Sequence, residues 1–337
     1  ADGRRGVHRE MKALVYEAPE TLAYREMPDP LPGDGEQLIR VEAVGICGSD
    51  MHAYLGHDDR RPAPLILGHE AAGVIVGGPR DGARVTINPL VTCGDCPACR
   101  AGRENLCRDR QIISMPPREG AFAEWVTMPD RNLVPVPDVV PLDKAALAEP
   151  LAVSWHAARL ALAALHPSME RRALVIGGGA IGLAAALALS AMGVEAVEIS
   201  EPNDIRRAFL TAHCGQTAVA NADRPFPVVV DAVGHAATRA TASALAEPGG
   251  VIAHVGLGED AGGLGIRRMT LQEITFIGTY TYTAQDFRDT CRAIFDGRLG
   301  PLDWAEARSL GDGAAAFRDI RAGRTPAPKI ILAPRPH

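Results

Sequence analysis

The 337-residue sequence has no apolar run of eighteen or more residues, and it contains only three lysines among its 35 basic side chains. The first absence excludes a membrane-spanning helix. The net charge of −6 argues against a basic nucleic-acid-binding face as the main function. Hydrophobic residues make up 47% and charged residues 23%, which is ordinary for a globular protein and excludes disorder as the dominant state. The length predicts two domains.

The first ten residues are polar and lack the apolar core of a signal peptide. The segment from Met11 onward resembles a more natural start, so we expect residues 1–10 to be disordered or extraneous. We accordingly expect a cytoplasmic protein.

The pattern along the chain predicts two kinds of architecture. Residues 11–148 contain short β-branched or alternating runs separated by Gly, Pro and Asp, which predicts a β-rich domain. In residues 149–284, short apolar strands alternate with helical stretches, which predicts a doubly wound parallel sheet in an α/β domain. The last segment, 285–337, is too short to fold alone, and we expect it to rejoin the first domain.

Four of the seven cysteines are crowded into residues 92–108, as Cys93-x2-Cys96-x2-Cys99-x7-Cys107. Four thiolates at this spacing can close a tetrahedral shell around a zinc ion, and a shell without an open position is structural. The alternative is a loop of four free thiols, which would invite oxidation. In a chain of this length without an export signal, the cluster favours zinc in a reducing compartment over a disulfide framework.

A second set of possible metal ligands is dispersed: Cys47, His69, Glu70 and Glu149. Together they offer the sulfur, nitrogen and oxygen ligands of a catalytic zinc, which keeps one position open. Each residue taken alone has a structural alternative. The cysteine could be a small core residue, the histidine a hydrogen-bonded structural residue, and Glu149 a favourable charge in the first turn of a helix.

A glycine-rich loop follows the apolar run ALVI and precedes a helical stretch. Gly177, Gly179 and Gly182 fit the dinucleotide motif G-x-G-x-x-G. The first allows the tight turn, the second lets a pyrophosphate approach the backbone, and the third permits close packing of helix and strand. Glu201 ends the next strand and can bind the ribose hydroxyls, which favours NAD over NADP. The alternative is a plain turn.

Three arginines leave alternatives open. Arg206 follows the acidic residue Glu201 by five positions. It could cover the adenine, meet a phosphate and weaken the preference for NAD, or simply be solvated. Arg60 and Arg61 precede the GHE motif and could face an anionic substrate or belong to a solvated loop.

Taken together and in their order, these motifs resemble the zinc-dependent medium-chain dehydrogenase/reductase superfamily, in the branch of sorbitol, threonine and butanediol dehydrogenases. The resemblance covers nearly the whole chain from Met11, and it rests on the four-cysteine loop and on CGSDMH, GHEAAG, EPL, GGGAIG, DAVG and VGLG. It implies a GroES-like catalytic domain, a Rossmann domain and a homodimer or homotetramer. It also implies hydride transfer between a secondary alcohol or polyol and NAD, which gives a ketone or aldehyde.

The resemblance also implies a role for individual residues. Cys47, His69, Glu70 and Glu149 match ligands of the catalytic zinc, which would accompany the structural zinc, and Asp50 matches a residue that orients the histidine. Ser49 matches the hydroxyl that receives the substrate proton, and His52 the residue that passes it to solvent. The matching cofactor contacts, besides the motif glycines, are Ile181, Glu201, Arg206, Val255, Gly256, Leu257, Thr279, Tyr280 and Thr281.

Two departures from the polyol branch concern the substrate. The branch typically has an arginine where this chain has Thr281, and often an aromatic residue where it has Ala53. Both argue against sorbitol or xylitol. Two alternative functions are a zinc-independent quinone reductase on the same fold and a non-catalytic redox sensor that binds zinc and NAD. Quinone reductases of that kind lack both sets of metal ligands, whereas this chain has both. Retention of Ser49 and His52 argues against a sensor.

Overall fold

The computed structural model describes residues 10–335 and divides the chain into two compact units. Among these residues, the first unit comprises 10–149, 306–325 and 329–335, and the second comprises 150–305 and 326–328. The expected N-terminal extension lies outside the described residues except for Glu10, which begins the first strand. Within residues 10–335, no helix combines the length and the apolar character needed to cross a membrane.

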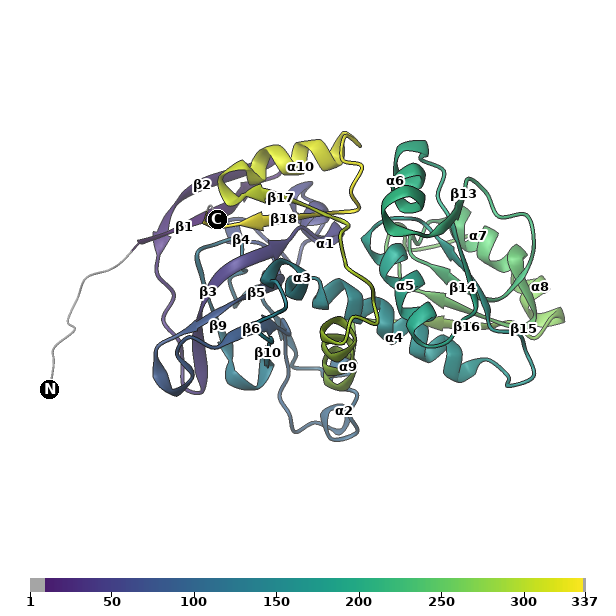
Figure 1. The fold of residues 1–337 in the computed structure, drawn as a ribbon, viewed down its shortest axis with the longest axis horizontal. Helices are drawn as coiled ribbons and strands as arrows, with labels where there is room; N and C mark the ends of the chain where they lie inside the picture. Colours follow the sequence, from purple (N-terminus) through teal and green to yellow (C-terminus); the bar gives the residue numbers. More distant parts are fainter. Residues whose placement is uncertain (1–9, 336–337) are drawn as a thin grey trace, which may run out of the picture. The chain divides into compact units, whose positions relative to one another are not determined.

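The first unit is built from mainly antiparallel strands. Its largest sheet has the order β10-β6-β5-β3-β18-β17, with β9 also paired to β3, and a second sheet has the order β2-β1-β4 (Figure 1). The strands are β1 (Glu10–Ala18), β2 (Thr21–Pro28), β3 (Glu36–Gly45), β4 (Leu65–Ile66), β5 (Glu70–Val76), β6 (Arg84–Ile87), β7 (Leu90–Val91), β8 (Gln111–Ile112), β9 (Trp125–Pro129), β10 (Leu133–Pro135), β17 (Ala305–Ser309) and β18 (Lys329–Ala333). The helices include α1 (Gly48–Tyr54), α2 (Pro97–Arg100), α3 (Leu142–Ala146) and α10 (Gly313–Arg321).

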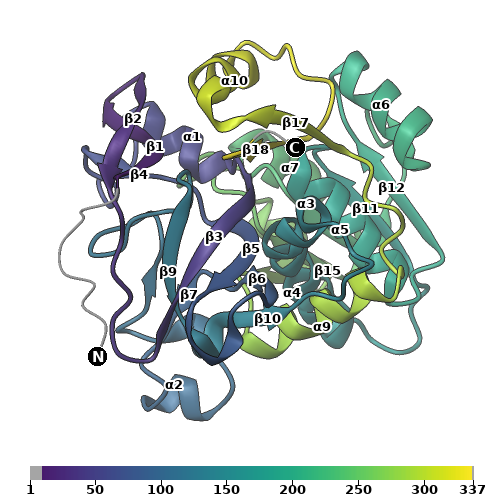
Figure 2. The same ribbon diagram turned by 60° about the vertical axis from the view of Figure 1, so that its left-hand side comes forward.

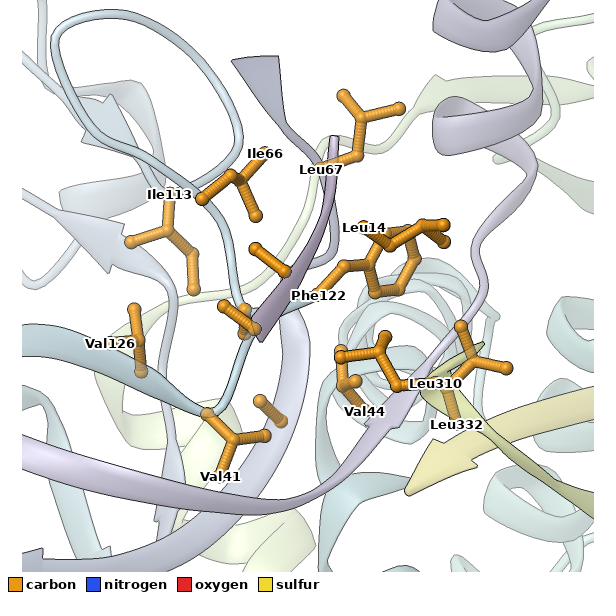
Figure 3. Packing of buried hydrophobic residues seen from close by; sticks show 14 of the residues in the cluster. Leu14, Val41, Val44, Ile66, Leu67, Ile113, Phe122, Val126, Leu310 and Leu332 are labelled. Carbon is orange, nitrogen blue, oxygen red and sulfur yellow. The ribbon is translucent and has the colours of Figure 1, made fainter. Parts of the chain in front are cut away.

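The core of this unit joins segments that are far apart in the sequence. Figure 3 shows Leu14 of β1 and Phe122 close to Leu310 and Leu332 from the C-terminal segment, and all four are fully buried. The ring of Phe122 also meets that of Phe317 on α10 edge-on, at 6.0 Å between centroids. Burial of this apolar surface draws the C-terminal segment back to the first unit.

The register of three neighbouring strands fixes which residues meet at one end of the large sheet. Gly45, the last residue of β3, pairs with Glu70 at the start of β5 on one side and with Ile331 of β18 on the other. Figure 2 shows β18 beside β3. A Cβ atom on Gly45 would lie 2.1 Å from a carboxylate oxygen of Glu70, so this close approach requires glycine.

The second unit is a six-stranded sheet in which every neighbouring pair is parallel, with the order β13-β12-β11-β14-β15-β16. This is the doubly wound order, and it confirms the predicted Rossmann domain. All six residues of β14 are buried, as expected for a strand covered on both faces. The elements are α4 (Ala148–Ala164), β11 (Arg172–Ile176), α5 (Ala180–Ala191), β12 (Ala196–Ser200), α6 (Asp204–Cys214), β13 (Thr217–Val219), β14 (Phe226–Asp231), α7 (Ala236–Leu245), β15 (Ala246–His254), α8 (Ile266–Leu271), β16 (Thr275–Gly278) and α9 (Ala284–Phe295).

The chain leaves the second unit later than the sequence pattern suggested. The expected return to the first unit at residue 285 is wrong, because α9 and the residues up to 305 belong to the second unit. The buried carboxylate of Asp286 on α9 explains the difference. It lies 2.6 Å from Nδ1 of His156 and accepts a 2.6 Å hydrogen bond from Nε of Arg159, both on α4. This polar contact joins α9 to α4.

We predict that Asp286→Asn destabilises the second unit by roughly 2–4 kcal/mol at pH 7, because it removes the charged partner of the buried His156 and of Arg159. Urea denaturation followed by circular dichroism measures the change. Asp289→Asn on the same helix is the control and should cost about 1 kcal/mol or less, because its partner Arg292 is exposed.

The predicted difference depends on pH. Burial alone would raise the pKa of Asp286, but His156, Arg159 and Thr283 hold it well below the ordinary value of 3.8. The stabilisation by Asp286 is therefore complete above pH 3.8 and fades as the pH falls below it. The free energies of unfolding of the unchanged protein and of Asp286→Asn should therefore converge in acid. If Asp286→Asn were as stable as the unchanged protein at pH 7, the assigned role of Asp286 would be contradicted.

Candidate functional site

The short helix α1 follows Cys47 directly and contains the rest of the CGSDMH motif. Cys47 is its N-cap, and the buried carboxylate of Asp50 accepts a 2.9 Å hydrogen bond from the Cys47 backbone N–H. The other oxygen of Asp50 accepts from the backbone N–H of Gly68 at 3.1 Å. One buried carboxylate therefore holds two distant segments, one carrying Cys47 and the other carrying His69.

Three of the four dispersed residues converge. The potential ligand atoms of Cys47, His69 and Glu70 lie within 4.8 Å of one another. A thiolate, an imidazole and a carboxylate form the donor set that zinc takes in catalytic sites, so these residues fit such an ion. Glu149, at the start of α4, is buried but lies outside this group. Its charge does act on Lys329, which contacts Glu70.

Lys329 is a buried cation beside the metal-ligand group, and no motif in the sequence indicated it. Its ammonium donates to both carboxylate oxygens of Glu70, at 2.7 and 2.6 Å, and to the backbone carbonyl of Ile46 at 2.9 Å. Burial alone would lower the pKa of Lys329, but the charges of Glu70 and Cys47 raise it. A lysine at the start of a strongly apolar strand, in a chain with only three, is the signal that could have revealed it.

Asp50 and Ser114 both face Nδ1 of His69. An Asp50 oxygen lies 3.5 Å from this nitrogen and the Ser114 hydroxyl 3.4 Å from it. Burial alone would lower the pKa of His69, but the charge and hydrogen bond of Asp50, with a contribution from Cys47, raise it well above 6.5. A partner on Nδ1 leaves the other ring nitrogen for a metal ion, which would replace the proton there.

Ser49 and His52 lie on α1 directly after Cys47. Ser49 is partly buried and His52 is exposed. Residues three apart on a helix share a face, so the two side chains project from the same side of α1. This arrangement is suited to proton transfer.

The four cysteines of the loop between β7 and β8 also converge, since all four sulfur atoms lie within 4.8 Å of one another. The sulfur of Cys93 is 3.9 Å from that of Cys99 and 3.5 Å from that of Cys107. Tetrahedral sulfurs about 2.3 Å from a zinc ion would lie about 3.8 Å apart, so the cluster fits the ion. Backbone N–H groups of Asp95 and Cys96 lower the pKa of Cys93 to about 7, which favours its thiolate.

The glycine-rich loop of the second unit joins β11 to α5. Gly177 has the left-handed φ of 94°, and a Cβ on Gly182 would lie 1.7 Å from the Gly177 carbonyl oxygen. A Cβ on Gly179 would meet nothing within 4 Å. That open space beside the first turn of α5, which begins at Ala180 with Ile181 next to it, fits a pyrophosphate.

Glu201 follows β12 and is held in place by the backbone. One oxygen of its buried carboxylate accepts from the N–H of Gly178 and the other from the N–H of Asn203, both at 2.8 Å. Arg206 lies on α6, and its buried Nε has no partner within residues 10–335. The fixed carboxylate and the unsatisfied donor are both suited to contact a ligand.

Two further loops complete the carboxyl edge of the parallel sheet. After β15, the N–H groups of Val255 and Gly256 both donate to the Asp231 carbonyl at 3.0 Å, and Leu257 is exposed. After β16, Thr279 donates its N–H to the His254 carbonyl at 3.0 Å. Tyr280 and Thr281 follow.

Thr281 has two features that are typical of residues at ligand-binding sites. It has a left-handed φ of 46°, and its buried hydroxyl has no partner in the part of the chain that the structure describes. Ligands of open parallel sheets bind at the carboxyl ends of the strands, so the residues of this unit fit a dinucleotide there.

The neighbouring residues Arg60 and Arg61 have different surroundings in the structure. Arg60 is 63% exposed, whereas the side chain of Arg61 is only 2% exposed. Arg61 therefore belongs to neither of the two alternatives considered from the sequence, a substrate-facing side chain or a solvated loop.

Two family models match the chain. Residues 33–138 match the alcohol dehydrogenase GroES-like domain, and residues 180–296 match the zinc-binding dehydrogenase model. The first match confirms the predicted GroES-like domain.

Curated and solved relatives extend over almost the full chain. L-galactonate-5-dehydrogenase of Escherichia coli K12 is 31% identical over 308 residues, covering 86% of this chain and 88% of the relative. The structure of an alcohol dehydrogenase from Escherichia coli CFT073 complexed with NADH has a TM-score of 0.86 and 26% identity, covering 96% and 99% of the two chains. A zinc-binding dehydrogenase from Sinorhizobium meliloti 1021 bound to NADP has a TM-score of 0.84 and 27% identity, covering 97% and 100%. The chain therefore belongs to the zinc-type medium-chain alcohol dehydrogenase superfamily.

Proposed function

We propose that the protein is an NAD-dependent, zinc-containing dehydrogenase that interconverts a secondary alcohol or polyol-like substrate with the corresponding ketone or aldehyde. The observation that carries this proposal is the convergence of Cys47, His69 and Glu70 within 4.8 Å. The residues at the carboxyl edge of the parallel sheet support the cofactor. Reduction of NAD by the purified protein, measured with a panel of secondary alcohols and diols, tests the proposal. No turnover with bound zinc would favour the sensor function.

Cys47, His69 and Glu70 or Glu149 would hold one zinc ion, and the four loop cysteines would hold a second. Zinc at the first site would act as a Lewis acid that makes the substrate hydroxyl acidic enough to lose its proton near neutral pH. The ammonium of Lys329 lies 2.6 Å from the Glu70 carboxylate. It therefore partly neutralises the negative charge that this carboxylate would offer a metal ion. Glu149 is near enough for its charge to act on Lys329, so we propose that either acid can bind during turnover.

Ser49 would accept the substrate proton, and the exposed His52 would pass it to solvent with the cofactor ribose between them. The serine follows Cys47 by two residues on α1, which keeps its hydroxyl near the metal-ligand group. The histidine is suited to its role because an exposed imidazole can both accept and donate a proton.

Glu201 would select NAD. Its carboxylate is pinned by two backbone N–H groups, so it cannot move away from a 2′-phosphate, which its charge would repel. Arg206 would favour NADP instead if its unpaired Nε bound the 2′-phosphate. We propose that the carboxylate dominates, because it is buried and fixed.

The substrate class follows from the superfamily and from two substitutions. One relative is named for its action on L-galactonate, a polyhydroxylated compound, whereas Ala53 and Thr281 argue against sorbitol and xylitol. We also propose a homodimer or homotetramer. The edge strand β16 of the six-stranded sheet presents backbone groups that a second chain could pair with. The exposed thiol of Cys93 is suited to a reducing compartment such as the cytoplasm.

Cys47→Ala is expected to reduce the zinc content from two ions per chain to one. It should also lower kcat/KM by at least about 1,000-fold, because several kcal/mol of Lewis-acid stabilisation is lost. Metal analysis and NAD reduction measure the two effects. Cys214→Ala on α6 is the control, since Cys214 belongs to neither metal-ligand group. A fully active Cys47→Ala protein would disprove the catalytic zinc.

Glu201→Gln should raise the ratio of kcat/KM with NADP to kcat/KM with NAD by about 10–100-fold, because a like-charge contact with the 2′-phosphate is removed. Steady-state kinetics with both cofactors measure this ratio. The control Glu198→Gln lies on the same strand, β12, where its carboxylate is 3.6 Å from Arg224. An unchanged ratio in Glu201→Gln would show that this carboxylate does not select the cofactor.

Ser49→Ala should lower kcat by about 100- to 10,000-fold, the range over which a positioned proton acceptor contributes. The zinc content should stay at two ions per chain, since the hydroxyl is not a ligand. Met51→Leu on the same helix serves as the control for small changes in packing. Undiminished turnover in Ser49→Ala would exclude the serine from proton transfer.

A further inference from the structure

Two adjacent arginines with the same acidic partner have different surroundings. Arg60 and Arg61 both bind Asp58, through contacts of 2.8 and 2.6 Å. The Arg60 guanidinium is exposed, but that of Arg61 is buried and donates a further 3.0 Å hydrogen bond from Nε to the carbonyl oxygen of Ser114. A buried guanidinium that joins two distant loops holds their geometry because its donors form a rigid planar fork.

Ser114 occupies a backbone conformation that needs such support. Its φ is 71°, in the left-handed region that non-glycine residues rarely adopt, and the residue is fully buried. This conformation places its hydroxyl 3.4 Å from Nδ1 of His69. Strained backbone persists where the surrounding contacts over-determine it, and the hydrogen bond from Arg61 is one such contact.

Asp50 alone holds the histidine ring only loosely. Its oxygen is 3.5 Å from Nδ1 and already accepts the N–H of Gly68. The Ser114 hydroxyl approaches the same nitrogen, so the ring has two neighbours on this edge. The direction of the opposite nitrogen, which would bind a metal ion, depends on both of them.

We propose that Arg61 and Ser114 are positioning residues of the metal site. Arg61 binds the Ser114 carbonyl, the bound serine keeps its hydroxyl against Nδ1 of His69, and the ring thereby directs its other nitrogen toward Cys47 and Glu70. Neither residue belongs to the metal-ligand group of Cys47, His69 and Glu70. This inference rests on the proposed catalytic zinc and identifies how the chain tunes its affinity.

The test measures zinc affinity at the two sites separately, by competition with a colorimetric chelator. Ser114→Ala removes one oxygen atom and keeps the carbonyl that Arg61 binds. Arg61→Met removes the fork and keeps an apolar stem. Both should weaken zinc binding at the Cys47 site by about 10–100-fold, the usual effect of losing a group that orients a ligand. The four-cysteine site in the same molecule should be unchanged.

Two controls separate positioning from general stability. Arg60→Met loses a contact with the same Asp58 but leaves Ser114 untouched, and its zinc affinity should stay within about twofold of the unchanged protein. Arg61→Lys keeps the charge but lacks the fork, and it should recover only part of the affinity. In protein loaded with Co²⁺, the visible absorption of the Cys47 site should shift in Ser114→Ala and not in Arg60→Met.

The possible failures can be told apart. If Cys47→Ala retains both zinc ions, the proposed catalytic zinc fails, and this inference fails with it. If Cys47→Ala loses one ion but Ser114→Ala binds zinc as tightly as the unchanged protein, only the positioning role is overturned. If Arg61→Met does not fold, which loss of zinc from the four-cysteine site would reveal, the result for Ser114→Ala decides.

Discussion

The register of β18, β3 and β5 is the constraint on which the metal-ligand group depends. Pairing Gly45 with both Glu70 and Ile331 places the ends of three strands side by side. Lys329 begins β18, Cys47 follows β3, and Glu70 begins β5. A one-residue slip of any strand would turn its side chains to the opposite face, so the donor set exists only in this register. The buried core around Phe122 and Leu332 holds the C-terminal strand in place.

Buried charge at the site is balanced by specific partners. Glu70 is paired with Lys329, and Asp50 accepts from the N–H groups of Cys47 and Gly68. Although burial would raise the pKa of Asp50, the charge and hydrogen bond of His69 and the charge of Arg61 hold it below its ordinary value. Each ionised group thus retains a partner that compensates its desolvation. The ligands are held before any ion arrives, which lowers the cost of ordering them on binding.

The sequence revealed what depends on local spacing. The four cysteines lie within fifteen residues and the glycine-rich loop within six, so short-range geometry decides both. Cys47, His69 and Glu70 could be named as possible ligands from their residue types, but their grouping relied on the motifs of a known superfamily, because spacing alone does not show which distant loops meet.

The residues that support these ligands were not predictable in the same way. Arg61 resembled any surface arginine in a loop, and Ser114 belonged to no motif. Their roles arise from a tertiary contact between residues 53 positions apart. The boundary at residue 285 was misplaced for a related reason. An amphipathic helix does not indicate which unit it packs on, whereas the contacts of Asp286 with α4 do.

We propose that this chain holds two zinc ions in chemically different shells, one of four sulfurs and one of a single sulfur with nitrogen and oxygen. Zinc K-edge X-ray absorption of the fully loaded protein tests this most directly. We expect five sulfur ligands shared between two zinc ions, at about 2.3 Å, together with nitrogen and oxygen ligands at about 2.0–2.2 Å. A spectrum with four sulfurs around every zinc ion and no nitrogen or oxygen shell would contradict it.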